Sequence, residues 1–187
     1  MALEATFRHL SVSLHKLHDA LNALHVTVGD KPPDDEAALA DGLENAVLDM
    51  MGTLHEARKS AAEARRAVGT PIDLDRARRA LTGCQRRFHR MEQQFASELV
   101  SYEKLRELAR LGRARRREWI PWANSTKAAI EQCREPIELT SKALACCWQE
   151  LAERLGTTNI SMQATNVGQQ ITLPRSRVED LEAEGVT

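Results

Sequence analysis

Apolar residues recur in alternating steps of four and three along the first part of the chain. The positions are Leu3, Phe7, Leu10, Leu14, Leu17, Leu21, Leu24 and Val28. This seven-residue repeat holds for more than three cycles and places all of these side chains on one side of a helix. The spacing therefore predicts a helix over residues 3–28 that packs this side against other helices.

Two further segments carry the same kind of spacing. The second helix is expected to begin after a capping aspartate, Asp34 or Asp35, and to end near Val68. The third is expected to follow residues 70–73, which offer a capping hydroxyl, a proline at the first helical position and an acid in the first turn. Its apolar positions continue over residues 74–111, so this helix should be about 60 Å long.

The fourth predicted helix contains two prolines. Because Pro121 fits a first turn better than a helix interior, we expect this helix to begin between Glu118 and Ser125. It should end near Leu155 and bend at Pro136, whose ring removes a backbone donor and collides with the preceding turn.

Glycines mark the ends of these four patterns. Glycine just past a helix end adopts the left-handed conformation without steric cost, so we expect it at Gly29, Gly69, Gly112 and Gly156. Gly42 and Gly52 lie inside the second helix and should weaken it by about 1 kcal/mol each unless a close contact offsets the loss.

Four helices of similar length joined by short breaks predict an all-α fold. We expect an elongated up-down-up-down four-helix bundle over residues 1–156. The alternative is an extended helical hairpin that completes its bundle by dimerising. The second half of helix 2 carries only alanines on its apolar side, so a neighbouring helix should approach it closely there.

Residues 157–187 follow a different pattern. Apolar and polar residues alternate with a period of two, which is typical of a β-strand, and the apolar set includes Ile160, Met162, Val167, Ile171 and Leu173. Residues 176–179 resemble a capping box that opens a short last helix with Val178 and Leu181 inward.

This strand-like tail has no sheet to join in a helical bundle. An isolated hairpin of this size is only marginally stable in water, so we expect the tail to seek cover on a partner or on a second copy by strand addition. The alternatives are a tail that folds back on its own helices and one without fixed structure.

Basic residues are concentrated in one region although the net charge is only −1. Residues 75–118 hold 13 Lys or Arg against 6 Asp or Glu, whereas residues 1–74 hold 7 against 12. At the end of this basic region lies a cluster of arginines and tryptophans, Arg113, Arg115, Arg116, Arg117, Trp119 and Trp122. Arginine binds phosphates and indole rings stack on bases or enter a lipid interface, so this cluster is a candidate for nucleic-acid or anion binding. The alternative is that the arginines pair with acidic faces of helices 1 and 2, and that the tryptophans seal the end of the bundle.

Signals for catalysis or metal binding are weak. The cysteines Cys84, Cys133, Cys146 and Cys147 show no Cys-x-x-Cys spacing, and the sequence contains no nucleophile elbow, phosphate loop or zinc-protease motif. His15 and His18 are three residues apart, but they flank the apolar side of helix 1 and no Glu-x-x-His occurs in the chain. We therefore expect no metal, no cofactor and no enzymatic activity.

The expected function is a non-enzymatic helical scaffold or adaptor that assembles through its C-terminal tail with a protein partner or another copy. The alternative is a nucleic-acid or anionic-surface binder that uses helix 3 and the cluster Arg113–Arg117. We expect a cytoplasmic location, because buried reduced thiols suit the cytosol and the sequence shows neither a signal peptide nor a membrane span of roughly 18 apolar residues.

Overall fold

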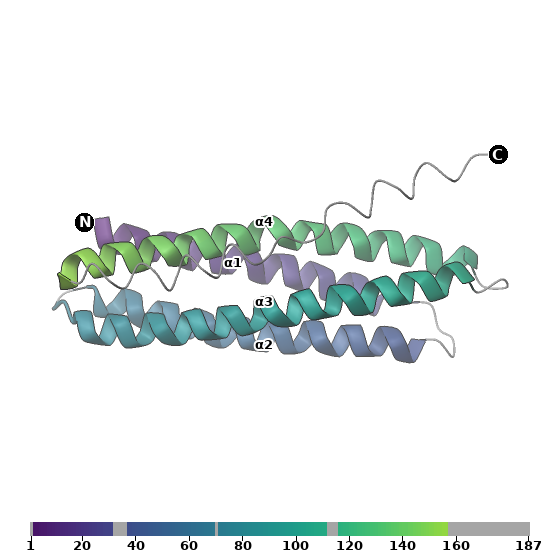
Figure 1. Ribbon diagram of the computed structural model, residues 1–187, viewed down its shortest axis with the longest axis horizontal. Helices are drawn as coiled ribbons and strands as arrows, with labels where there is room; N and C mark the ends of the chain where they lie inside the picture. Colours follow the sequence, from purple (N-terminus) through teal and green to yellow (C-terminus); the bar gives the residue numbers. More distant parts are fainter. Residues whose placement is uncertain (1, 32–36, 70, 112–115, 157–187) are drawn as a thin grey trace.

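The computed structural model describes residues 2–31, 37–69, 71–111 and 116–156. Four helices make up this part of the chain: α1 (Ala2–Gly29), α2 (Ala37–Ala67), α3 (Leu74–Leu111) and α4 (Arg116–Leu155). They run alternately up and down along the long axis of the molecule (Figure 1). The predicted all-α, up-down-up-down four-helix bundle is therefore confirmed.

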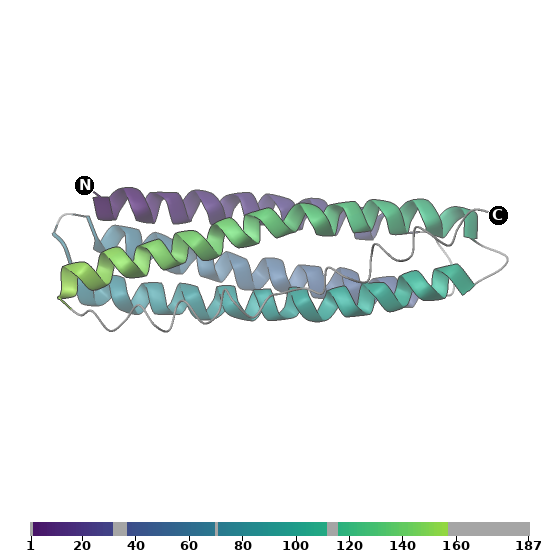
Figure 2. The ribbon, with the colours of Figure 1, turned by 45° about the horizontal axis from the view of Figure 1, so that its top comes forward.

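The bundle closes within one chain. α1 packs against α2 and α4, and α3 packs against the same two helices. Figure 2 shows the four helices side by side from a second direction. The alternative of an open hairpin that needs a second chain to complete the bundle is therefore wrong. The α3–α4 side is packed less closely than the other three sides.

The predicted apolar side of α1 forms the centre of the core. None of its eight residues is more than 5% exposed, and six of them are fully covered. α2 contributes buried alanines in its second half, Ala57, Ala61 and Ala64. α3 lies close to α2 at this level, since a side-chain carbon built on Gly83 would lie 3.5 Å from Oγ of Ser60. The small residues thus set a short distance between these two helices.

Only one of the expected left-handed glycines is found in the described residues. Gly156 has a φ of 68° and ends α4, whereas Gly29 and Gly69 do not have positive φ. The helices end there with helix-type hydrogen bonds instead: the amide of Asp30 donates to the carbonyl of Val26 at 3.2 Å, and the amide of Gly69 donates to that of Arg66 at 3.1 Å. The expectation was therefore wrong at Gly29 and Gly69, and Gly112 lies outside the described residues.

α4 begins at Arg116, before the predicted range of Glu118 to Ser125. Pro121 therefore lies inside the helix and not in its first turn. Pro121 is exposed, whereas Trp119 and Trp122 on either side of it are buried. Burial of these two large rings holds the additional turn and outweighs the backbone hydrogen bond that the proline removes.

The tail lies outside the described residues. Its strand-like pattern at Ile160, Met162, Val167, Ile171 and Leu173, and the terminal helix after it, stay predictions. The same holds for the boundary between a bundle over 1–156 and a tail over 157–187.

The two exposed glycines of α2 should be replaceable with a gain in stability. No atom lies within 4 Å of a side-chain carbon built on Gly42 or Gly52, so no close contact offsets their cost. Gly42→Ala and Gly52→Ala should each raise the free energy of unfolding by roughly 0.5–1 kcal/mol, measured by urea denaturation.

Gly83→Ala provides the matched comparison. Its new methyl group would lie 2.9 Å from Nη1 of Arg87, which donates to Oγ of Ser60 at 3.1 Å. Displacing this guanidinium should reduce or cancel the gain. Equal gains at Gly52 and Gly83 would contradict this account.

Candidate interaction groove between α1 and α2

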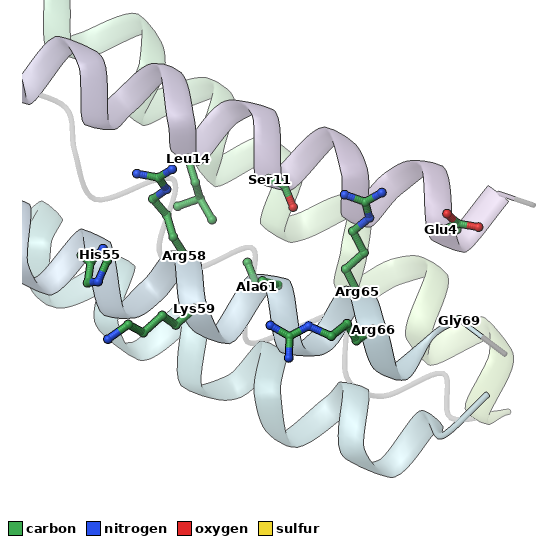
Figure 3. Close-up of a pocket in the computed structure, with 11 residues that line it drawn as sticks. Glu4, Ser11, Leu14, His55, Arg58, Lys59, Ala61, Arg65, Arg66 and Gly69 are labelled. Carbon is green, nitrogen blue, oxygen red and sulfur yellow. The ribbon is translucent and has the colours of Figure 1, made fainter. Parts of the chain in front are cut away.

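A groove with a volume of about 800 Å³ runs between α1 and α2. It lies along the first half of α1 and the second half of α2, near the end of the bundle where α1 begins (Figure 3). α1 lines it with Glu4, Ser11 and Leu14, and α2 lines it with His55, Arg58, Lys59, Ala61, Ala62, Arg65 and Arg66, with Gly69 just beyond its end.

The floor of the groove is apolar because its side chains are small or aliphatic. Leu14 lies on the α1 side and Ala61 on the α2 side, facing each other in Figure 3. The Ser11 hydroxyl donates to the carbonyl of Phe7 at 3.0 Å, so its hydrogen is used within its own helix. Leu14 and Ala61 are 0% and 1% exposed, so the apolar surface that an entering side chain would meet is that of the partly exposed Ala62 and of the aliphatic parts of the basic side chains.

The α2 side of the groove is basic. Arg58 and Arg65, like Lys59 and Arg66, are seven residues apart, which is two helical turns or about 10 Å. In Figure 3 Arg58 and Arg65 extend toward α1, while Lys59 and Arg66, which also line the groove, extend away from α1. The two pairs form two parallel rows of positive charge.

Two of these four basic side chains have no partner within the described residues. Nη2 of Arg58 lies 3.1 Å from Nδ1 of His15, and Nζ of Lys59 lies 2.7 Å from Oε1 of Glu56. Arg65 and Arg66 are exposed and form no hydrogen bond or ion pair in the part of the chain that is described. Their guanidinium groups are available to an external carboxylate or phosphate.

The one acidic residue that lines the groove is already engaged. Oε1 of Glu4 lies 3.3 Å from Nη2 of Arg8 on the next turn of α1. Its charge is therefore partly compensated, and the groove as a whole presents positive charge beside the partly exposed Ala62. This combination suits an acidic amphipathic segment.

The predicted cluster near the start of α4 is only partly described. Arg113 and Arg115 lie outside the described residues. Arg116 and Arg117 belong to the first turn of α4. Whether these four arginines act together stays a prediction.

Trp119 and Trp122 lie in the interior at the end of the bundle, 3% and 6% exposed. Their rings meet edge to face, with centroids 5.2 Å apart. Nε1 of Trp122 donates to the carbonyl of Val28 at 3.2 Å, and the Tyr102 hydroxyl donates to the carbonyl of Ala123 at 2.5 Å. These contacts fit the interpretation that the tryptophans seal the bundle, since neither ring is displayed for stacking on a base.

The arginines of α3 divide into two groups. Nε of Arg76 lies 3.2 Å from Oε1 of Glu63 on α2, and Arg87 donates to Ser60 of the same helix. In contrast, Arg79, Arg86 and Arg90 are exposed and have no ion pair within the described residues. Pairing with the acidic side of α2 thus accounts for only some of the basic charge on α3.

The groove was not among the predicted sites. Composition drew attention to residues 75–118, because residues 1–74 as a whole are acidic. The signal that could have revealed it is local: two basic pairs with a seven-residue spacing lie beside the alanines of α2. Such spacing places the charges at the edge of a close helix contact.

Three of the four thiols are buried in the core. Burial raises the pKa of Cys84 and of Cys133 to about 12 and that of Cys147 above its usual range. These thiols stay protonated at neutral pH, and the protonated form is a poor nucleophile. Cys146 is exposed. No group of three potential metal ligands gathers within the described residues.

A buried carboxyl group lies on the opposite side of the bundle. Glu92 of α3 is 5% exposed and lines a cavity of about 190 Å³ between α3 and α4. Burial raises its pKa to about 7. Nδ1 of His89 lies 3.6 Å from its Oε2, while the α4 residues that line the cavity carry no charge: Ser141, Leu144, Ala145 and Trp148.

The stability of the protein should therefore depend on the protonation of Glu92. Between pH 4.5 and about 7 the folded state holds this proton and the unfolded state releases it, so stability should fall as pH rises through this window. Glu92→Gln removes this dependence. The free energy of unfolding of the Glu92→Gln variant should exceed that of the unaltered protein by roughly 2–3 kcal/mol at pH 8. At pH 5, where Glu92 is protonated in the folded protein, the difference should be much smaller.

Urea denaturation at several pH values would measure this difference. Glu135→Gln, which changes an exposed residue of α4, is the control and should show a nearly constant difference. A difference for Glu92→Gln that does not change with pH would contradict the assignment.

None of the described helices combines the length and the apolar character needed to cross a membrane. Comparison with protein-family models, with curated proteins and with solved structures gave no match to this chain. No residue role can therefore be transferred from a relative. The basic groove, the buried thiols and the composition of the tail are the features from which a function can be inferred.

Proposed function

We propose that the protein is a non-enzymatic helical scaffold or adaptor subunit that mediates protein–protein assembly through its C-terminal tail, residues 157–187. The observation that carries this proposal is the completeness of the core. The apolar side of α1 is no more than 5% exposed at any of its eight positions, because the other helices already cover it. The interior therefore offers no place for further apolar side chains.

The tail brings five such side chains, Ile160, Met162, Val167, Ile171 and Leu173. They need cover on a surface, and cover on another molecule removes apolar area from both partners. A protein partner or a second copy of the chain is the occupant that this requirement favours.

The chemistry of the cysteines supports a non-enzymatic role. Cys84, Cys133 and Cys147 are held protonated by burial, so none of the three is activated for nucleophilic attack. Buried thiols of this kind also suit a reducing compartment, which supports a cytoplasmic location.

The second candidate function is binding to nucleic acid or another anionic surface. The specific observation in its favour is the set of exposed arginines without ion pairs among the described residues, Arg79, Arg86 and Arg90 on α3. The cluster Arg113–Arg117 would extend this set along the chain. Burial of Trp119 and Trp122 removes stacking as a source of affinity, so such binding would be electrostatic.

Deletion of residues 157–187 should abolish assembly while leaving helicity and thermal melting nearly unchanged. The reason is that the core described above is made within residues 2–156. Sedimentation analysis and circular dichroism would measure the two properties. A second variant that keeps the full length but changes Ile160, Met162, Val167, Ile171 and Leu173 to serine should behave in the same way. A truncated protein that assembles as well as the full chain would refute the proposal.

Electrostatic binding to nucleic acid predicts a gel shift at low salt that disappears steeply as salt rises. Changing Arg113, Arg115, Arg116 and Arg117 to glutamine should weaken it and reduce its salt dependence. Arg8→Gln with Arg78→Gln is the control, because it removes two positive charges that already pair with Glu4 and Asp75. Failure to shift duplex or single-stranded nucleic acid at low salt eliminates this candidate.

A further inference from the structure

The end of the chain is acidic and amphipathic. Residues 178–187 contain four acidic residues and no basic residue, together with Val178 and Leu181. On a helix, Val178 and Leu181 would be neighbours three residues apart, and the same spacing relates Glu179 to Glu182. The segment would thus present apolar side chains flanked by carboxylates.

The groove between α1 and α2 has complementary properties. Ala62 is partly exposed on its surface, and Arg65 and Arg66 are without partners in the described part of the chain. From His55 to the end of α2 the groove is about 18 Å long, and a ten-residue helix is about 15 Å long. The segment and the groove therefore agree in length and in charge, and the aliphatic stems of the basic side chains of the groove can cover the apolar side chains of the segment.

The position of the groove relative to the end of α4 makes an exchange between two copies possible. α4 ends at Leu155, at the end of the bundle where α1 begins and α2 ends (Figures 1 and 2). Gly69, which lines the groove, follows the end of α2 and lies at this same end. The connecting residues 157–177 can span up to about 70 Å. A two-fold axis near this end would allow each tail to reach the groove of the other copy, which gives a closed, symmetric pair.

We propose that the groove between α1 and α2 is the docking site for the acidic segment 178–187 of a second copy of this chain. The inference rests on the proposed function, because it identifies the surface to which the assembling tail attaches. The apolar part of the tail gains cover for its side chains against the second copy, and the acidic end fixes its position through Arg65 and Arg66 of the groove.

Charge reversal in the full-length protein tests this proposal. One variant, the groove variant, carries Arg65→Glu and Arg66→Glu. The other, the tail variant, carries Glu179→Lys, Asp180→Lys, Glu182→Lys and Glu184→Lys. In each variant alone the groove and the tail have like charges, so the dissociation constant for self-association should rise by about tenfold or more. Sedimentation velocity at several concentrations measures this change.

The decisive measurement is the mixture of the two variants. The native tail of the groove variant matches the native groove of the tail variant, and the two reversed elements match each other. A mixture should therefore form a heterodimer, although neither variant dimerises at the same concentration. High salt should weaken the contact in the unaltered protein as well.

Arg79→Glu with Arg90→Glu is the matched control. It makes the same charge change at exposed residues of α3 and should leave self-association within about twofold of the unaltered protein. Thermal melting of all variants separates loss of docking from loss of folding.

Three results would overturn the proposal. If both charge-reversed variants associate as well as the unaltered protein, the groove is not the docking site, while assembly through the tail still stands on the deletion experiment. If the variants are monomeric and remain so when mixed, the contact does not pass between copies. If the unaltered protein does not self-associate, a second copy is not the occupant.

Discussion

The mutual covering of four apolar helix sides is the constraint on which the whole structure depends. Each helix has one apolar side, and each such side is removed from water only when the neighbouring helices lie against it. The fully buried leucines of α1, among them Leu14 and Leu17, show how complete this covering is. Tertiary packing of this kind outweighs local preferences: α4 begins before Pro121 because Trp119 and Trp122 are buried there.

The same constraint produces the groove. The buried side of α2 consists of alanines in its second half, such as Ala57 and Ala61. Small side chains let the neighbouring α3 approach closely near Ser60 and Gly83. They also leave space beside α1 above Leu14, which itself stays fully buried. In the second half of α2, the heptad spacing places alanines toward the core and basic residues at the edge of the helix contact. The charge of the groove and its depth therefore come from the same stretch of sequence.

Much of this fold could be predicted from the sequence, because heptad spacing determines which side of a helix is buried. Details that depend on local hydrogen bonds could not. Gly29 and Gly69 end their helices without the left-handed conformation, since helix-type bonds from Asp30 and Gly69 complete the last turns. The groove depends on which rows of side chains on α1 and α2 face each other, and the sequence of a single helix does not determine this. Residues 1–74 are acidic overall, so a count of charges over this region does not reveal its local basic edge. This edge is formed by Arg58, Lys59, Arg65 and Arg66.

The two sides of α2 explain how an acidic segment would find a single position on so regular a surface. Toward α3, α2 presents Glu63, which pairs with Arg76. An acidic segment placed there would compete with Glu63 for the same guanidinium. Toward α1, Arg65 has no partner in the described residues, so a carboxylate gains an ion pair without breaking one. Apolar contacts are tolerant of position, whereas unfavourable charge pairs exclude alternatives. Affinity would thus come from the apolar tail, and the choice of site from the charges on α2.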